Sequence, residues 1–166
     1  MTPIMTERSF EIITHSAKQT AEVGRRLGRL LAPGDVVCLH GDLGSGKTCL
    51  TQGIGKGLEV AGVISSPTFV LIAEHGPLRD GPYLYHVDLY RIDDYAAAFG
   101  LGLEDYMYGD GVTVIEWAER ADELLPPERL CVLLTYLDHT KRSIAFEATG
   151  ARYIEMVAKL RVALGV

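Results

Sequence analysis

A glycine-rich stretch from Gly41 to Thr48, reading GDLGSGKT, carries the residues with the clearest chemistry. It fits the pattern G-x-x-x-x-G-K-[ST], the loop that wraps the phosphates of a nucleoside triphosphate. Glycine permits positive φ angles, so that successive backbone N–H groups turn inward and form a concave anion site. Lys47 adds a positive charge, and the Thr48 hydroxyl is placed to bind a Mg²⁺ ion that bridges the terminal phosphates.

The residues on either side of this loop supply the elements that the chemistry needs. Residues 36–40 are a short apolar run typical of a buried strand, and residues 49–58 have the length and one-sided apolar character of a helix. A helix that begins near Lys47 directs the positive end of its dipole at the same phosphates. The order of strand, loop and helix favours a phosphate-binding loop over an ordinary glycine turn.

Two carboxylates lie at the ends of predicted strands. Asp88 lies near the end of the strand predicted for 83–90, and Glu116 ends the strand predicted for 112–116. A P-loop enzyme needs an acid at such a place to hold Mg²⁺ through water or to orient an attacking water. The two acids can exchange these roles, so the sequence leaves their assignment open. His86, in the first of these strands, is interpreted as a structural histidine.

Three further residues are candidates near the nucleotide. A helix is predicted from about residue 17 to 31 behind a capping box of the S-x-x-Q kind, and the turn around Ser16 that precedes it is a candidate border of the adenine. Thr68 follows a proline and either contacts the γ-phosphate or Mg²⁺ or belongs to a loop that precedes a strand at 69–74. Trp117, the only tryptophan, follows Glu116 directly and is either a core aromatic or a reporter on the nucleotide.

The length and composition favour one globular domain spanning residues 1–166, which buries roughly two thirds of its unfolded surface. Hydrophobic residues make up 48% and charged residues 23%, which argues against disorder. No apolar run reaches the roughly 18 residues that a membrane span needs, and the first residues lack the regions of a signal peptide. We therefore expect a cytoplasmic protein without membrane contact.

The net charge and the cysteines argue against further classes of protein, namely those that bind nucleic acid directly and those that contain disulfides or a zinc site. The net charge of −6, from 16 Lys and Arg against 22 Asp and Glu, is unsuited to binding nucleic acid over a broad surface, so any link to RNA is expected through a partner. Cys38, Cys49 and Cys131 form no C-x-x-C pair, which predicts free thiols rather than disulfides or a zinc site. Cys49, beside a lysine at a helix N-terminus, is a candidate for a lowered pKa.

The rest of the chain completes the predicted fold. Strands are expected at 130–137 and 143–149, and an amphipathic helix at 151–164. Helices alternate with strands early in the chain, whereas hairpin-like connections appear later. We therefore predict an α/β fold: a P-loop NTPase-like three-layer domain with a mixed, mostly parallel central sheet flanked by helices.

Several segments together resemble one family, the bacterial TsaE (YjeE) family of small P-loop ATPases in tRNA threonylcarbamoyladenosine biosynthesis. The P-loop alone is generic, whereas the set is specific and occurs in the family's order and spacing. The matching segments are GDLGSGKT at 41–48, SPTF at 66–69, YHVDLYR at 85–91 and VIEWAER at 114–120.

The resemblance implies a domain that binds ATP and Mg²⁺, hydrolyses ATP weakly alone and acts with the TsaB and TsaD proteins. In the family this cycle supports modification of the adenosine next to the anticodon in tRNAs that read codons beginning with A. By position, Thr48 and Glu116 match the Mg²⁺ positions, and Lys47, Asp88 and Glu116 are the catalytic candidates. The ATP-binding candidates are Ser16, Leu43, Gly44, Ser45, Gly46, Lys47, Thr48, Asp88 and Trp117, and contact from Lys141 or Arg142 is left open.

Two other functions share these residues. A small-molecule or nucleoside kinase needs an acceptor pocket and usually an arginine-bearing lid, and no insertion with clustered arginines is evident, although Arg91 and Arg120 could serve. A nucleotide-binding module without turnover needs only the loop. A GTP switch is disfavoured, because the chain contains no asparagine and so lacks the N-K-x-D motif of many GTPases.

Overall fold

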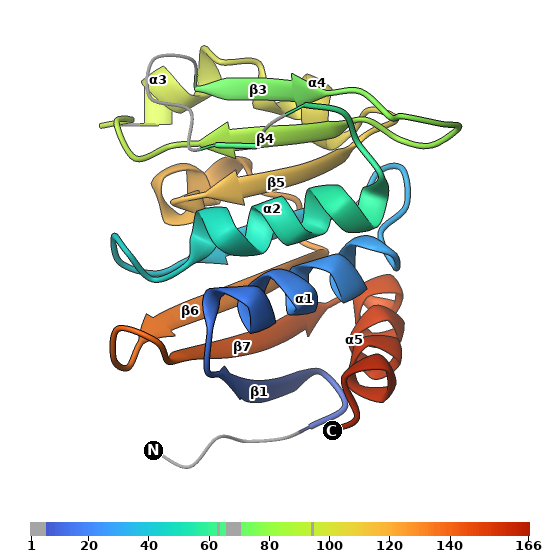
Figure 1. Cartoon of the computed structure of the whole chain (residues 1–166). Coiled ribbons are helices and arrows are strands. Elements are labelled where there is room, and N and C mark those ends of the chain that lie inside the picture. Colours follow the sequence, from blue (N-terminus) through green and yellow to red (C-terminus); the bar gives the residue numbers. More distant parts are fainter. Residues whose placement is uncertain (1–5, 63, 66–70, 94) are drawn as a thin grey trace.

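The structure is a computed structural model that describes residues 6–62, 64–65, 71–93 and 95–166. Its elements alternate between strands and helices along most of the chain (Figure 1). Thr68 and the first two residues of the strand predicted for 69–74 lie outside the described residues. In chain order the elements are β1 (Ser9–Thr14), α1 (Ala17–Gly28), β2 (Val36–His40), α2 (Lys47–Leu58), β3 (Ile72–His75), β4 (Leu84–Asp88), α3 (Tyr95–Phe99), α4 (Leu103–Met107), β5 (Val112–Glu116), the 3₁₀ helix η1 (Ala118–Leu124), β6 (Arg129–Tyr136), β7 (Arg142–Thr149) and α5 (Ala151–Leu164).

The strands form one sheet in the order β1-β7-β6-β2-β5-β4-β3. The four central strands β6, β2, β5 and β4 are parallel to one another, whereas β3 at one end and β7 and β1 at the other pair antiparallel. The predicted mixed sheet flanked by helices is therefore confirmed, with parallel pairing limited to its middle. Parallel strands place their carboxyl ends at one edge, and that edge carries the glycine-rich loop, Asp88 and Glu116.

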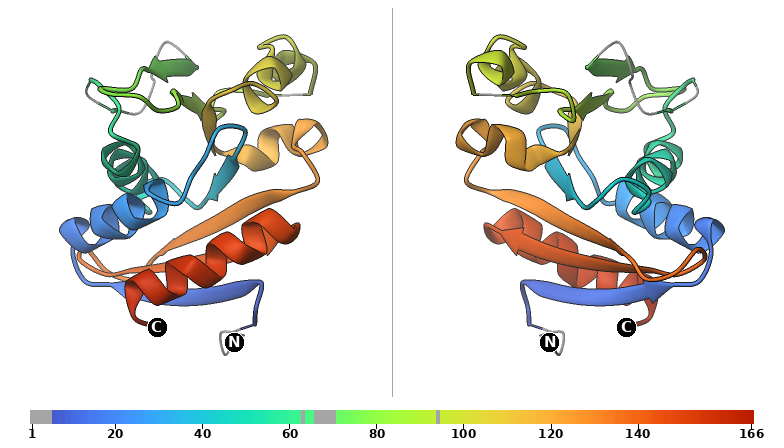
Figure 2. Two further views of the ribbon diagram at one scale, coloured as in Figure 1. Left: turned by 90° about the vertical axis from the view of Figure 1, so that its right-hand side faces the viewer. Right: turned by 90° about the vertical axis from the view of Figure 1, so that its left-hand side faces the viewer.

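Helices cover the sheet on both faces, as Figure 2 shows for α1 and α2 on one side and α3, α4 and η1 on the other. The larger core joins α1, α2 and α5 to the strands through residues such as Leu27, Ile54 and Met156. The smaller core joins α3, α4 and η1 to the opposite face of β2, β4 and β5. Alternate residues of the central strands thus enter different cores, which explains why these strands read as continuous apolar runs.

Helices α1 and α2 approach each other closely enough for their backbones to touch. A Cβ atom built on Gly24 would lie 2.3 Å from the Leu50 carbonyl oxygen, and one on Gly53 would lie 2.0 Å from the Ala21 carbonyl oxygen. Gly28 and Gly57 are equally restricted by the facing helix. Glycine at these positions therefore permits the close approach of α1 to the helix that follows the glycine-rich loop.

The start of α1 is fixed by the predicted capping box. The Ser16 hydroxyl accepts a hydrogen bond from the Gln19 backbone N–H at 3.1 Å, and the Gln19 side chain accepts one from the His15 N–H at 2.7 Å. The first bond satisfies a donor that the first helical turn leaves without a partner, and the second holds the chain just before the N-cap residue. The helix ends at Gly28, three residues before the predicted end.

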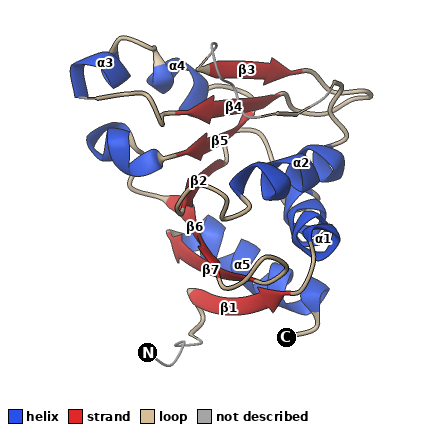
Figure 3. Ribbon diagram, turned by 60° about the vertical axis from the view of Figure 1, so that its left-hand side comes forward, coloured by secondary structure: helices blue, strands red, loops and turns tan. Residues whose placement is uncertain are grey.

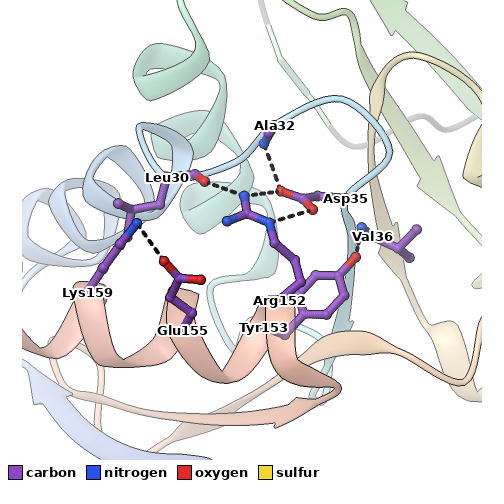
Figure 4. Close-up of polar contacts among 8 residues, drawn as sticks. All are labelled: Leu30, Ala32, Asp35, Val36, Arg152, Tyr153, Glu155 and Lys159. Atoms are coloured by element: carbon purple, nitrogen blue, oxygen red, sulfur yellow. Dashed lines mark hydrogen bonds and ion pairs between the residues drawn. The ribbon is translucent and has the colours of Figure 1, made fainter.

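A polar cluster ties α5 to the beginning of β2 (Figure 4). The buried Asp35 carboxylate accepts hydrogen bonds from the Ala32 N–H and the Arg152 guanidinium, and Arg152 also donates to the Leu30 carbonyl. The Tyr153 hydroxyl accepts from the Val36 N–H at 2.8 Å. The amino end of β2 is therefore held by the C-terminal helix, while its carboxyl end leads into the glycine-rich loop.

Strand β1 was not predicted from the sequence. It pairs antiparallel with β7 and contributes Phe10, whose ring stacks on Phe146 at 4.8 Å between centroids.

No helix of the described residues is long and apolar enough to cross a membrane.

We expect Gly53→Ala to lower the free energy of unfolding by about 1–3 kcal/mol, because its Cβ would collide with the Ala21 carbonyl in the α1–α2 contact. Urea unfolding followed by circular dichroism measures this change. Gly81→Ala is the matched control, since its nearest atom outside the adjoining residues is 3.8 Å away. Equal stability of the two variants would contradict the tight helix contact.

Candidate functional site

The candidate site lies at the carboxyl edge of the central strands β2, β5 and β4, which run side by side in the middle of the sheet (Figure 3). The glycine-rich loop connects β2 to α2, and Asp88 and Glu116 are the last residues of β4 and β5. These segments are far apart in the sequence. Parallel pairing brings them to one edge, as expected for ligand sites in such sheets.

The loop has the backbone that its glycines predict. Gly41, Gly44 and Gly46 have φ angles of 144°, 76° and 104°, in a region that residues with a side chain rarely adopt. Gly46 directly precedes the first helical residue, Lys47, so the loop ends on the N-terminus of α2. Unpaired N–H groups and the positive end of the helix dipole favour an anion there.

Lys47 reaches back across the loop. Its ammonium group donates to the Gly41 carbonyl at 2.5 Å and the Asp42 carbonyl at 2.9 Å. The same nitrogen lies 4.5 Å from the centre of the Trp117 ring, within cation–π range. Burial lowers the pKa of Lys47, while the charges of Glu116 and Asp88 act in the opposite direction. The lysine is therefore held by groups that an anion in the loop can replace.

The two predicted acids are neighbours. Asp88 of β4 and Glu116 of β5 are register partners, and both are almost fully buried, at 6% and 3% exposure. Partners on adjacent parallel strands point to the same side, here toward the face that carries α2. Asp88 accepts a hydrogen bond from the Tyr90 N–H at 2.9 Å, which fixes one carboxylate oxygen.

His86 holds the second acid. Its Nε2 lies 2.5 Å from the Glu116 Oε2 atom, and both side chains are buried. The other ring nitrogen, Nδ1, is buried without a hydrogen-bond partner among the described residues. His86 is therefore structural, as interpreted from the sequence, and its contact orients the Glu116 carboxylate. The spacing of two residues between His86 and Asp88 places both side chains on one face of β4, but the contact with Glu116 depends on β5 being the neighbouring strand.

Trp117 takes an unusual backbone conformation. Its φ of 57° and ψ of 41° are left-handed, and only one other described residue that is not glycine, Glu59, has a positive φ. The indole packs against the Tyr90 ring at 5.1 Å and lies 5.7 Å from the Arg120 guanidinium carbon. Such strain costs on the order of 1–3 kcal/mol and persists where surrounding contacts hold it. Here it turns the indole toward Lys47.

A cleft of about 430 Å³ unites these parts. It contains the predicted catalytic, ATP-binding and metal residues except Ser16, while Thr68 lies outside the described residues, and it adds four residues that were not among those predictions. The predicted residues that line it are Leu43, Gly44, Ser45, Gly46, Lys47, Thr48, Asp88, Glu116 and Trp117, and the additional ones are Cys49, Leu71, Tyr90 and Arg91.

Ser16 lines a smaller cavity of about 90 Å³ next to this cleft. Gly46 and Cys49 border both spaces, so the two are adjacent around the start of α2. Arg142 also lines the smaller cavity, whereas Lys141 does not. Of the two residues whose contact with the nucleotide the sequence left open, only Arg142 therefore lies beside this space. The predicted lowering of the Cys49 pKa is wrong: burial raises it, because an apolar environment disfavours the thiolate.

The oxygen donors in the cleft fit a Mg²⁺ ion. Thr48 and Glu116 both line it, and they offer a hydroxyl and a carboxylate. Among the described residues no group of three or more His, Cys, Asp and Glu side chains forms a metal cage. Mg²⁺ is usually held by one or two protein oxygens together with water and substrate phosphates, so a sparse set of hard donors is the expected pattern.

Fold and site together define a class of protein: a mixed α/β domain with a P-loop between a central strand and a helix. Two acids lie at the ends of the adjacent strands β4 and β5. The family model "Threonylcarbamoyl adenosine biosynthesis protein TsaE" matches residues 14–144. The chain therefore belongs to the TsaE family.

Individual relatives agree with this assignment. A Bacillus subtilis protein described as tRNA threonylcarbamoyladenosine biosynthesis protein TsaE is 40% identical over 141 residues, covering 84% of this chain and 86% of the relative. A Streptomyces coelicolor protein of the same description is 48% identical over 116 residues, covering 66% and 74%. The crystal structure of Bacillus subtilis YdiB has a TM-score of 0.80 at 33% identity and covers 94% of this chain and 96% of that one.

We expect a double-mutant cycle of His86→Ala and Glu116→Ala to give a coupling energy of about 1–3 kcal/mol, because the contact is buried and one partner is a carboxylate. Urea unfolding of the four proteins measures it. The pair His40 and Glu119, at 27% and 49% side-chain exposure, is the control, with an expected coupling of about 0.2–1 kcal/mol. Similar coupling in both cycles would contradict the orienting role of His86.

Proposed function

We propose that this protein is a Mg²⁺-dependent ATPase that assists threonylcarbamoyl modification of the adenosine next to the anticodon in tRNAs reading codons that begin with A. It acts in the cytoplasm with the TsaB and TsaD proteins. The observation that carries the proposal is the meeting of the glycine loop, Lys47, Asp88 and Glu116 in one cleft. The descriptions of the relatives as tRNA threonylcarbamoyladenosine biosynthesis proteins support the pathway.

The chain's own residues have separable roles in this proposal. Backbone N–H groups of residues 43–48 bind the phosphates, and Lys47 exchanges its carbonyl partners for phosphate oxygens. Thr48 and Glu116 would hold Mg²⁺, which would supply neutralisation of charge on the terminal phosphates. His86 keeps Glu116 oriented, and Asp88 orients the attacking water. Ser16 and Arg142, in the adjoining cavity, flank the adenine side.

Control of partner proteins fits the chain better than chemistry on a second substrate. The net charge of −6 disfavours direct binding of tRNA, so tRNA is reached through the complex. The arginines of α1 do not form a lid for phosphoryl transfer to an acceptor: Arg25 and Arg26 both pair with Glu22 of the same helix. These contacts weigh against the kinase alternative.

The deciding experiment measures phosphate release from ATP with Mg²⁺, first by this protein alone and then with TsaB and TsaD. We expect slow release alone and strong stimulation by the partners. Lys47→Ala is the blank, because it removes the charge that neutralises the phosphates. Trp117 fluorescence gives an independent measure of binding, since ATP draws Lys47 away from the indole. Bound ATP without stimulation would overturn the accessory role, and phosphorylation of an added acceptor would favour a kinase.

The two acids are distinguished by conservative variants. In the assembled system, we expect Asp88→Asn to lower hydrolysis by roughly 10²–10⁴-fold with ATP binding retained, because it removes the group that orients water. We expect Glu116→Gln to raise the Mg²⁺ concentration needed for half-maximal activity by about 10–100-fold. Titration of Mg²⁺ at saturating ATP checks both. Unchanged hydrolysis in both variants would instead indicate a binding module without turnover.

A further inference from the structure

Two cysteines that the proposed ATP site does not use lie side by side in the sheet. Cys38 of β2 and Cys131 of β6 are register partners on adjacent parallel strands, and both are free thiols. Cys38 is fully buried in the smaller core, and Cys131 packs against that core while remaining partly exposed. The third cysteine, Cys49, lies on α2, away from this pair.

Charged side chains surround the pair on the same face of the sheet. His40 lies two residues beyond Cys38, and Arg129 lies two residues before Cys131, so strand alternation places all four on one side. His40 Nδ1 lies 2.9 Å from the Glu119 carboxylate on η1, which holds the ring by one nitrogen. The Arg129 guanidinium donates to the Pro126 carbonyl at 2.8 Å and lies 3.6 Å from Asp122.

These neighbours make the two thiols unequal. Contact with the Cys38 thiol, with His40 and Arg129 acting in the same direction, lowers the pKa of Cys131 against the effect of burial. The same contact and burial raise the pKa of Cys38. Cys131 and Glu119 raise the pKa of His40 against burial, which favours its charged form. The arrangement therefore pairs a stabilised thiolate with a protonated thiol.

We propose that Cys131 and Cys38 form a peroxide-reactive dithiol, in which Cys131 is the nucleophile and Cys38 the resolving thiol. The Cys131 thiolate attacks one oxygen of hydrogen peroxide, the O–O bond breaks, and a sulfenic acid forms while the departing hydroxide takes a proton to become water. The Cys38 sulfur then attacks the sulfenic sulfur. The S–O bond breaks, and the Cys38 proton leaves with the hydroxide as a second water. Two thiols are oxidised to one disulfide as one peroxide is reduced to two waters.

The position of the pair suits both steps. Adjacent strands lie about 4.8 Å apart, within the range of roughly 4.4–6.8 Å between Cα atoms that a disulfide spans. Partial exposure admits a molecule as small as peroxide to Cys131, whereas Cys38 is reached only from its neighbour. Attack at Cys131 first is thus required by access as well as by charge.

The first test uses the unmodified protein. Brief iodoacetamide treatment at pH 6, followed by peptide mass spectrometry, compares the alkylation rates of the three cysteines in one sample. We expect Cys131 to react at least about tenfold faster than Cys49, because only a stabilised thiolate is abundant at that pH. Equal or slower reaction at Cys131 would overturn the proposal without any variant that has to fold.

The second test follows oxidation by one equivalent of hydrogen peroxide. Mass spectrometry under non-reducing conditions should show the loss of two hydrogen atoms and a peptide linked through Cys38 and Cys131. In Cys38→Ser a sulfenic acid at Cys131 should accumulate and be trapped by dimedone. Cys49→Ser, the matched control, should form the linked peptide as the unmodified protein does. A linked peptide that contains Cys49, or oxidised Cys38→Ser without adduct at Cys131, would refute the assigned roles.

Discussion

The parallel pairing of β2, β5 and β4 is the constraint on which the candidate site depends. It brings three strand ends, separated by up to some seventy-six positions between His40 and Glu116, to one edge of the sheet. The in-register pairing of Asp88 with Glu116 then places two carboxylates on the side where α2 begins. A shift of one residue in either strand would move its acid to the opposite face, among the apolar residues of the smaller core.

Buried charge at this edge is compensated by a small number of contacts. Glu116 has His86, Asp88 has the Tyr90 backbone, and Lys47 has two loop carbonyls and the Trp117 ring. A buried charge without a partner would cost several kcal/mol, so each contact contributes to holding these side chains in place. The contacts of Lys47 differ from the others, because they can be exchanged. The loop whose carbonyls hold the ammonium group can also present backbone N–H groups to an anion.

Much of this arrangement was predictable from the sequence because it depends on local patterns. The loop, the capping box, the strand 112–116 and the helix 151–164 follow from glycine spacing and apolar periodicity, and the structure confirms them. The contact of His86 with Glu116 depends on which strands become neighbours, which periodicity does not reveal. Strand β1 was missed because its antiparallel edge position leaves a weak pattern, with Glu11 among its apolar residues. The pairing of Cys38 with Cys131 likewise required the strand order.

The glycine contact between α1 and α2 has a mechanical consequence. Because carbonyl oxygens and Cα atoms meet there directly, no side-chain rotamer is available to absorb a sliding motion between the two helices. The contact therefore couples the two helices, and with them Ser16 at the start of α1 and Lys47 at the start of α2. The α1 and α2 side of the cleft therefore has a fixed shape, and adjustment to a ligand falls to the opposite wall, formed by Tyr90, Arg91 and Trp117.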